Sequence, residues 1–171
     1  SVGILLERSE AHESNRNVVI ETEKTDTTDG KGNPLYASDT SVAVSIEDPY
    51  AGIRSIEWSV NAPYDTGNNR NGIVTVDNNG AISDEAWKIT TADRNLVTGV
   101  SGQIPVFHNS NDIVVNVKVT DCAGNVTEKA VTISIDKTAP EISISYNDIA
   151  PDSIYTSVYK DVRVATVTVR E

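Results

Sequence analysis

Residues 113–135 of the chain are IVVNVKVTDCAGNVTEKAVTISI. Apolar side chains occupy every second position on both sides of a short polar segment, residues 121–125. Alternation with a period of two is typical of a strand with one buried face, and the Gly-Asn pair in the polar segment suits a tight turn. The sequence therefore predicts a long antiparallel hairpin. Its buried faces carry Ile113, Val115, Val117 and Val119 on the first strand and Val131, Ile133 and Ile135 on the second.

The same period recurs upstream, between segments rich in Gly, Asn, Asp and Pro that predict turns. Strands are expected from Asn17, over 41–47, over 55–60, over 73–76 and over 96–106. The connecting segments are 25–34, 48–52, the polar loop 61–72 and the turn 77–80. Residues 81–95 are less regular: a helical turn at 84–87 and a strand anchored by Trp87 and Ile89 are the two interpretations that the pattern leaves open. Seven or eight short alternating strands predict an all-β fold, an antiparallel β-sandwich.

The composition supports this fold class and excludes others. Val, Ile and Thr account for about 55 of the 171 residues and Leu for about four, and β-branched residues favour pleated sheets over helices. The formal net charge of -11 argues against a partner that is a nucleic acid or an anionic bilayer surface. No stretch is long and apolar enough to insert directly into a membrane. The single cysteine excludes an intramolecular disulfide and favours an exported bacterial chain over a disulfide-rich animal one.

The C-terminal part of the chain repeats the pattern of its beginning at an offset of about 123 residues. Tyr36 aligns with Tyr159, and the alternating residues of 42–46 align with those of 165–169. We therefore expect a leader or linker over 1–16, one complete sandwich over 17–138, and a linker with the first two strands of a second, truncated unit over 139–171. Such a chain belongs to a tandem array in which neighbouring repeats are the main partners.

Residues 115–140 resemble the closing hairpin and linker of bacterial immunoglobulin-like repeats, which occur in large surface proteins and adhesins. The shared motifs are the Asp-x-Ala-Gly-Asn turn at 121–125 and the Asp-x-Thr-Ala-Pro linker at 136–140, and residues 52–60 are similar to the third strand of these repeats. The resemblance implies an immunoglobulin-like sandwich of about seven strands that spaces, displays or adheres at a cell surface. Pro140 favours an extended chain at the linker, which suits an end-to-end array.

Calcium is the metal that the acidic turns would bind, because it takes six to eight oxygen ligands. Asp136 lies in the linker, and three further carboxylates lie in turns expected near one end of the sandwich: Glu47, Asp48 and Asp121. The alternative is that these carboxylates accept hydrogen bonds in turns and caps. No EF-hand pattern is present, and no other cofactor is implied.

Aromatic side chains suggest a second kind of site, a platform for a glycan. Trp87 lies in the irregular segment, and Tyr50 and Tyr64 flank loops, so these three residues are the candidates. Trp58 alternates with Ile56 and Val60 and is expected between the two sheets, with Glu57 outside. The alternative for Trp87 is also core packing.

Catalysis is not expected. The chain has two histidines, His12 and His108, and one cysteine, Cys122, with no nucleophile elbow and no metal-binding histidine pair. The sequence therefore predicts a non-catalytic module of an extracellular bacterial protein, at the cell surface or secreted, acting as a spacer or adhesion unit whose further partner is a host or cell-surface glycan or protein. The alternative is a carbohydrate-binding accessory module of a secreted glycoside hydrolase.

Overall fold

The computed structural model of the protein describes residues 16–146 and 164–171. The chain forms two compact units: the first ends at Lys137 and the second begins at Thr138. The sequence predicted this boundary between residues 138 and 139. Of the predicted leader, residues 1–15 lie outside the described residues.

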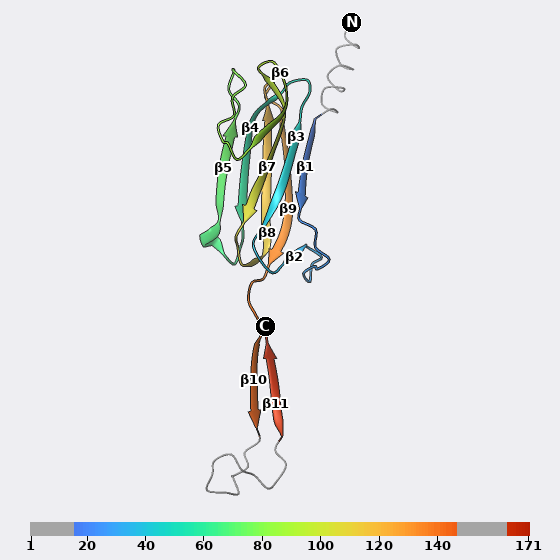
Figure 1. Ribbon diagram of the computed structural model, residues 1–171, viewed down its shortest axis with the longest axis vertical. Helices are drawn as coiled ribbons and strands as arrows, with labels where there is room; N and C mark the ends of the chain where they lie inside the picture. Colours follow the sequence, from blue (N-terminus) through green and yellow to red (C-terminus); the bar gives the residue numbers. More distant parts are fainter. Residues whose placement is uncertain (1–15, 147–163) are drawn as a thin grey trace. The chain divides into compact units, whose positions relative to one another are not determined.

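The predicted hairpin forms the centre of the larger sheet of the first unit (Figure 1). β8 (Ser110–Asp121) pairs with β9 (Val126–Ile135) on one side and with β4 (Ile53–Asn61) on the other, antiparallel in both cases. β5 (Arg70–Thr75) continues the sheet beyond β4. At the other edge, the short strand β2 (Leu35–Tyr36) runs parallel to β9. A central strand with partners on both sides must place its alternate residues on two distinct faces.

The second sheet has the order β1-β3-β7-β6 and covers the apolar face of the first. Its strands are β1 (Asn17–Thr22), β3 (Thr40–Glu47), β7 (Leu96–Val106) and β6 (Lys88–Asp93). The buried side chains of β3 and β7 belong to the same apolar core as those of β8 and β9. The all-β sandwich is thereby confirmed, and the order β1-β3-β7-β6 against β9-β8-β4 is that of an immunoglobulin domain.

One strand, β2, was not predicted, β6 was only one of two interpretations of residues 81–95, and the loop 61–72 was predicted too long. β2 is only two residues long, and β6 is exposed along its whole length, so neither shows an alternating pattern. The predicted loop 61–72 contains a 3₁₀ turn at Thr66–Asn68, but β5 already begins at Arg70. A polar strand start is tolerated there because β5 is an edge strand whose outer face meets water.

Each tryptophan ring lies over a glycine of a neighbouring strand. Trp87 is 3% exposed and covers Gly102 on β7, where an added Cβ would lie 2.3 Å from the indole. Trp58 covers Gly72 on β5 in the same way. Trp58 was predicted to be buried, but it is only partly so, because β5 is the last strand of its sheet and the ring lies at the open side of the sandwich.

The second unit contains β10 (Glu141–Tyr146) and β11 (Ala165–Arg170), which pair in antiparallel fashion. Their six residue pairs match the six pairs of β1 with β3. Val18 faces Ile46 in the first unit as Ile142 faces Val169 in the second, and Ile20 faces Val44 as Ile144 faces Val167. The offset is thus 124 residues on the first strand and 123 on the second.

We expect Gly102→Ala to destabilise the first unit by about 1–3 kcal/mol, because the added methyl group collides with the rigid indole of Trp87. Gly30→Ala is the matched control, since an added Cβ there meets nothing within 4 Å, and its effect should stay within about 0.5 kcal/mol. Urea unfolding followed by tryptophan fluorescence measures both. Equal stabilities of the two variants would contradict the proposed stacking of Trp87 on Gly102.

Candidate functional site

Arg16 joins three segments at one end of the first unit. Its Nε donates a hydrogen bond to Oδ2 of Asp48 at 3.2 Å, its Nη1 donates to Oγ1 of Thr127 at 2.9 Å, and its Nη2 pairs with Oδ2 of Asp121. The side chain of Arg16 is 9% exposed, and those of Asp48 and Asp121 are 2% and 1% exposed. We call Arg16, Asp48, Asp121 and Thr127 the arginine clamp.

The two carboxylates of the arginine clamp are positioned by the turns that they stabilise. Oδ1 of Asp48 accepts a hydrogen bond from the backbone N–H of Ala51, in the turn between β3 and β4. Asp121 accepts bonds from the backbone and side-chain amides of Asn125 across the β8–β9 turn, and Gly124 supplies the positive φ of 92° that this turn needs. Burial alone would raise the pKa of Asp121, but the bonds from Asn125 and the charge of Arg16 outweigh it and hold that pKa below its usual value.

The four carboxylates considered for calcium do not form one cluster. Asp48 and Asp121 do come together, yet a guanidinium stands between them. Glu47 is exposed, and Asp136 follows β9 at the opposite end of the unit, because β9 runs the whole length of β8 away from Asp121. Within the described ranges 16–146 and 164–171, no group of three or more His, Cys, Asp or Glu side chains is arranged to hold a metal ion.

The three aromatic residues considered for a glycan are also separated. Trp87 is buried and offers no open ring face. Tyr50 lies in the β3–β4 turn near Asp48, whereas the backbone N–H of Tyr64 bonds to Ser110 at the start of β8. Since β8 spans 12 residues, the two tyrosines lie at ends roughly 35–40 Å apart. Tyr64, at 76%, and Tyr50, at 58%, are both well exposed, but they form no common platform.

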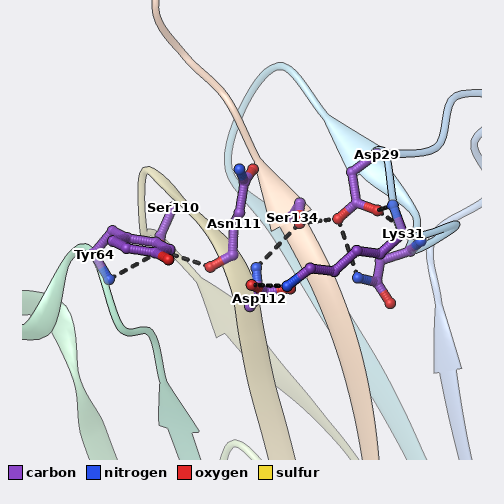
Figure 2. Close-up of polar contacts among 8 residues, drawn as sticks. Asp29, Lys31, Tyr64, Ser110, Asn111, Asp112 and Ser134 are labelled. Carbon is purple, nitrogen blue, oxygen red and sulfur yellow. Dashed lines mark hydrogen bonds and ion pairs between the residues drawn. The ribbon is translucent and has the colours of Figure 1, made fainter.

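A second polar network fastens the 25–34 loop to β8 and β9, at the end where Tyr64 lies (Figure 2). The carboxylate of Asp29 accepts bonds from Oγ of Ser134 at 2.6 Å and from the backbone N–H of Lys31 at 2.8 Å. Nζ of Lys31 pairs with Oδ2 of Asp112 at 2.7 Å, and the backbone N–H of Asp112 donates to Oγ of Ser134 at 3.2 Å. The Ser134 hydroxyl, together with bonds from Asn33 and Lys31, holds the pKa of Asp29 well below its usual range. The hydrogen bond and charge of Asp112 raise the pKa of Lys31.

Lys137 fixes the chain where it leaves the first unit. Its backbone N–H donates to Oδ1 of Asn109 at 3.0 Å, and its Nζ donates to the carbonyl of Phe107 at 2.7 Å and pairs with Asp39. The described part of the first unit therefore begins at the arginine clamp and ends at Lys137, at opposite ends of the sandwich (Figure 1).

None of these anchors was assigned from the sequence. Arg16 was placed in the leader, and Asp29 and Ser134 are 105 residues apart, so no local pattern links them. The arginine clamp consists of buried, paired charges, whereas the ion pairs of Lys31 and Lys137 are partly exposed to solvent. Cys122 and His108 do not combine either, because Cys122 lies in the turn after β8 and His108 lies before its start.

Comparisons with known proteins add little beyond the fold. No family model matches the chain, and no curated protein matches it. Among solved structures, a DUF4466 family protein from Parabacteroides merdae ATCC 43184 is 10% identical with a TM-score of 0.38 over 78% of this chain. The chain spans about half of that protein, 48% of its length. Murine CRIg is 15% identical with a TM-score of 0.33, covering 71% of this chain and 99% of its own. No helix among the described residues is long and apolar enough to cross a membrane.

We expect Arg16→Met to destabilise the first unit by about 3–5 kcal/mol at pH 7, because it leaves two buried carboxylates without their cation. Lys118→Met is the matched control. It breaks an exposed ion pair with Glu57 of 3.1 Å, and such pairs contribute at most about 1 kcal/mol. Chemical denaturation measures both variants.

Lowering the pH should reduce the difference in the free energy of unfolding between the Arg16→Met variant and the unaltered protein. In the unaltered protein Asp121 has a pKa below 3.8. Its ionised carboxylate therefore contributes fully to the free energy of unfolding above pH 3.8, and this contribution is lost as the pH falls further. In the variant Asp121 lacks the charge of Arg16 that helps to lower its pKa, so it takes up its proton at a higher pH, which removes that buried charge. If Arg16→Met loses little unfolding free energy at pH 7, or if its loss grows as the pH is lowered, then the arginine in the arginine clamp does not neutralise these carboxylates.

Proposed function

We propose that this chain is a non-catalytic, immunoglobulin-like spacer and adhesion module of an exported bacterial protein, built as a tandem array. One observation carries the proposal: β10 and β11 reproduce the β1–β3 pairing of the first unit in all six residue pairs. A second unit that opens with the same two strands is the simplest cause of this correspondence. The bacterial surface origin rests on the resemblance of the 121–125 turn and the 136–140 linker to surface repeats.

The apolar positions of β10 and β11 support a second unit that needs further strands. In the first unit the equivalent positions are buried at Val18, Val44 and Ile46 and half-buried at Ile20 and Thr22. In the second they are 58–68% exposed: Ile142, Ile144, Tyr146, Val167 and Val169. Fully burying side chains of this kind contributes about 1.5–3 kcal/mol each, and an isolated pair of strands is marginal in water. A second sheet, equivalent to the one centred on β8, is the cover that the first unit uses.

The path of the chain through the first unit supports a spacer. The arginine clamp holds the entry and Lys137 holds the exit, at opposite ends of a sandwich about 35–40 Å long. A module entered and left at opposite ends adds its full length to an array. Both ends are fastened by side chains, which favours a defined direction of the chain over a loose tether.

The pairing of carboxylates within the first unit also supports a spacer. The carboxylates of the arginine clamp, Asp29 and Asp112 are paired with cations or with N–H and O–H donors within the unit. Exposed candidates for adhesion are Tyr64 at one end and Tyr50 at the other, each on a connecting segment. Such segments are where sandwich domains carry binding residues.

Single-molecule force spectroscopy on a polypeptide that carries a complete second unit tests the tandem arrangement. Each unit of about 120 residues should give one unfolding event that lengthens the chain by roughly 400 Å, and the increments should be equal. Val167→Asp should remove one event from the series, and Val44→Asp, at the equivalent position, should remove another. A single irregular event, or a series that Val167→Asp leaves unchanged, would refute a second unit built on β10 and β11.

A further inference from the structure

His108 is the most deeply buried ionisable ring in the described part of the chain. It follows β7 and precedes β8, and its side chain is fully buried, at 0% exposed. Its Nε2 lies 3.2 Å from Oδ1 of Asn69. Its Nδ1 is buried and has no hydrogen-bond partner among the described residues.

The hydrogen bonds around Asn69 determine which nitrogen carries the proton. Oδ1 of Asn69 also accepts the backbone N–H of Ala62 at 2.7 Å, so this oxygen is the acceptor in both contacts. Nε2 of His108 must therefore be the donor, which leaves Nδ1 as the bare nitrogen of a neutral imidazole. A second proton on Nδ1 would enter a buried site that offers it no acceptor.

His108 and its neighbours fasten the loop of residues 62–69 to the start of β8. Besides the His108–Asn69 bond, the backbone N–H of Tyr64 donates to Oγ of Ser110 at 3.3 Å. The backbone N–H of Asn109 donates to Oδ2 of Asp65 at 2.8 Å. The same loop presents the ring of Tyr64, which is 76% exposed.

We propose that His108 is an acid-sensitive latch, which holds the 62–69 loop closed while its ring is neutral and releases the loop when Nδ1 takes up a proton. The charged groups around the ring act on its protonation in both directions. Arg70 on β5 and Lys137 beyond β9 repel an imidazolium, and Asp65 in the loop attracts it. Asp65 and Lys137 are already engaged with Asn109 and Asp39 respectively.

The direction of the pH response follows from the burial of the ring. Burial, aided by Arg70 and Lys137, lowers the pKa of His108 below 6.5, although Asp65 acts in the opposite sense. The open state, with the ring in water, therefore binds the proton more tightly. The equilibrium constant for closing the loop therefore has its highest value above pH 6.5. Below pH 6.5 it falls by about tenfold for each pH unit, until the pKa of His108 in the closed state is reached. Asp65 does not account for this window, because bonds from Asn109 and Asn68 lower its pKa below 3.8.

Amide hydrogen exchange on the intact chain tests the latch, measured between pH 7.5 and pH 5.5 and corrected for the intrinsic pH dependence of exchange. The amides of Ala62, Tyr64 and Asn109 should lose protection at the lower pH, by up to about tenfold, while that of Val117 in β8 keeps its protection. A loop whose protection does not change between these pH values would overturn the proposal.

Two variants separate a latch from a merely structural histidine. His108→Gln retains a donor for Asn69 but cannot titrate, so the pH response should vanish. Asn69→Asp places a carboxylate beside Nε2, so protonation should then strengthen closure and reverse the sign of the response. His12→Gln is the matched control and should respond like the unaltered chain. A response that persists in His108→Gln, or one abolished by His12→Gln, would assign the effect to another group.

Discussion

The pairing of β8 with strands on both of its sides is the constraint from which the first unit follows. Hydrogen bonds to β4 and β9 fix which residues of the three strands share a face. Ile113, Val115, Val117 and Val119 are then all buried on one face. A shift of one residue would turn this whole set toward water. The second sheet is needed because this apolar face must be covered, and β3 and β7 supply the matching face.

This central pairing also determines where the polar anchors can lie. Because β8 runs from one end of the unit to the other, Asp121 at its end and Ser110 at its start mark the two ends. Arg16 is attached at the first end and Lys137 at the other. The anchors thus make the entry and exit of the chain part of the fold, which is the property a spacer requires. The burial of Arg16 with two carboxylates makes that end dependent on charge pairing.

Residues with local patterns were predicted well, and residues whose partners are distant in the sequence were not. Alternation sufficed for β3 and β8, since each has one buried face and one more exposed face. It also located β9, although the last three residues of that strand are all buried. The burial of Trp58 was overestimated because alternation gives the face of a strand but not the distance from the edge of the sheet. Asp48 and Asp121 were correctly placed near one another, yet their partner Arg16 was not foreseen, because an arginine before the first strand has no sequence signature. The network of Asp29 and Ser134 was missed for the same reason, since it depends on the parallel approach of β2 to β9.

The equivalence of β10–β11 with β1–β3 is the central claim, and thiol labelling tests it most directly. In a Cys122→Ser background, Val44→Cys and Val167→Cys place a thiol at equivalent register positions, one 2% exposed and the other 59% exposed. In the 171-residue chain the thiol at 167 should react at the rate of an open site, and the thiol at 44 only through unfolding. In a polypeptide that carries a complete second unit both should react slowly, because a completed second sandwich would bury position 167 as the first buries position 44. A thiol at 167 that stays fully reactive there would contradict the account.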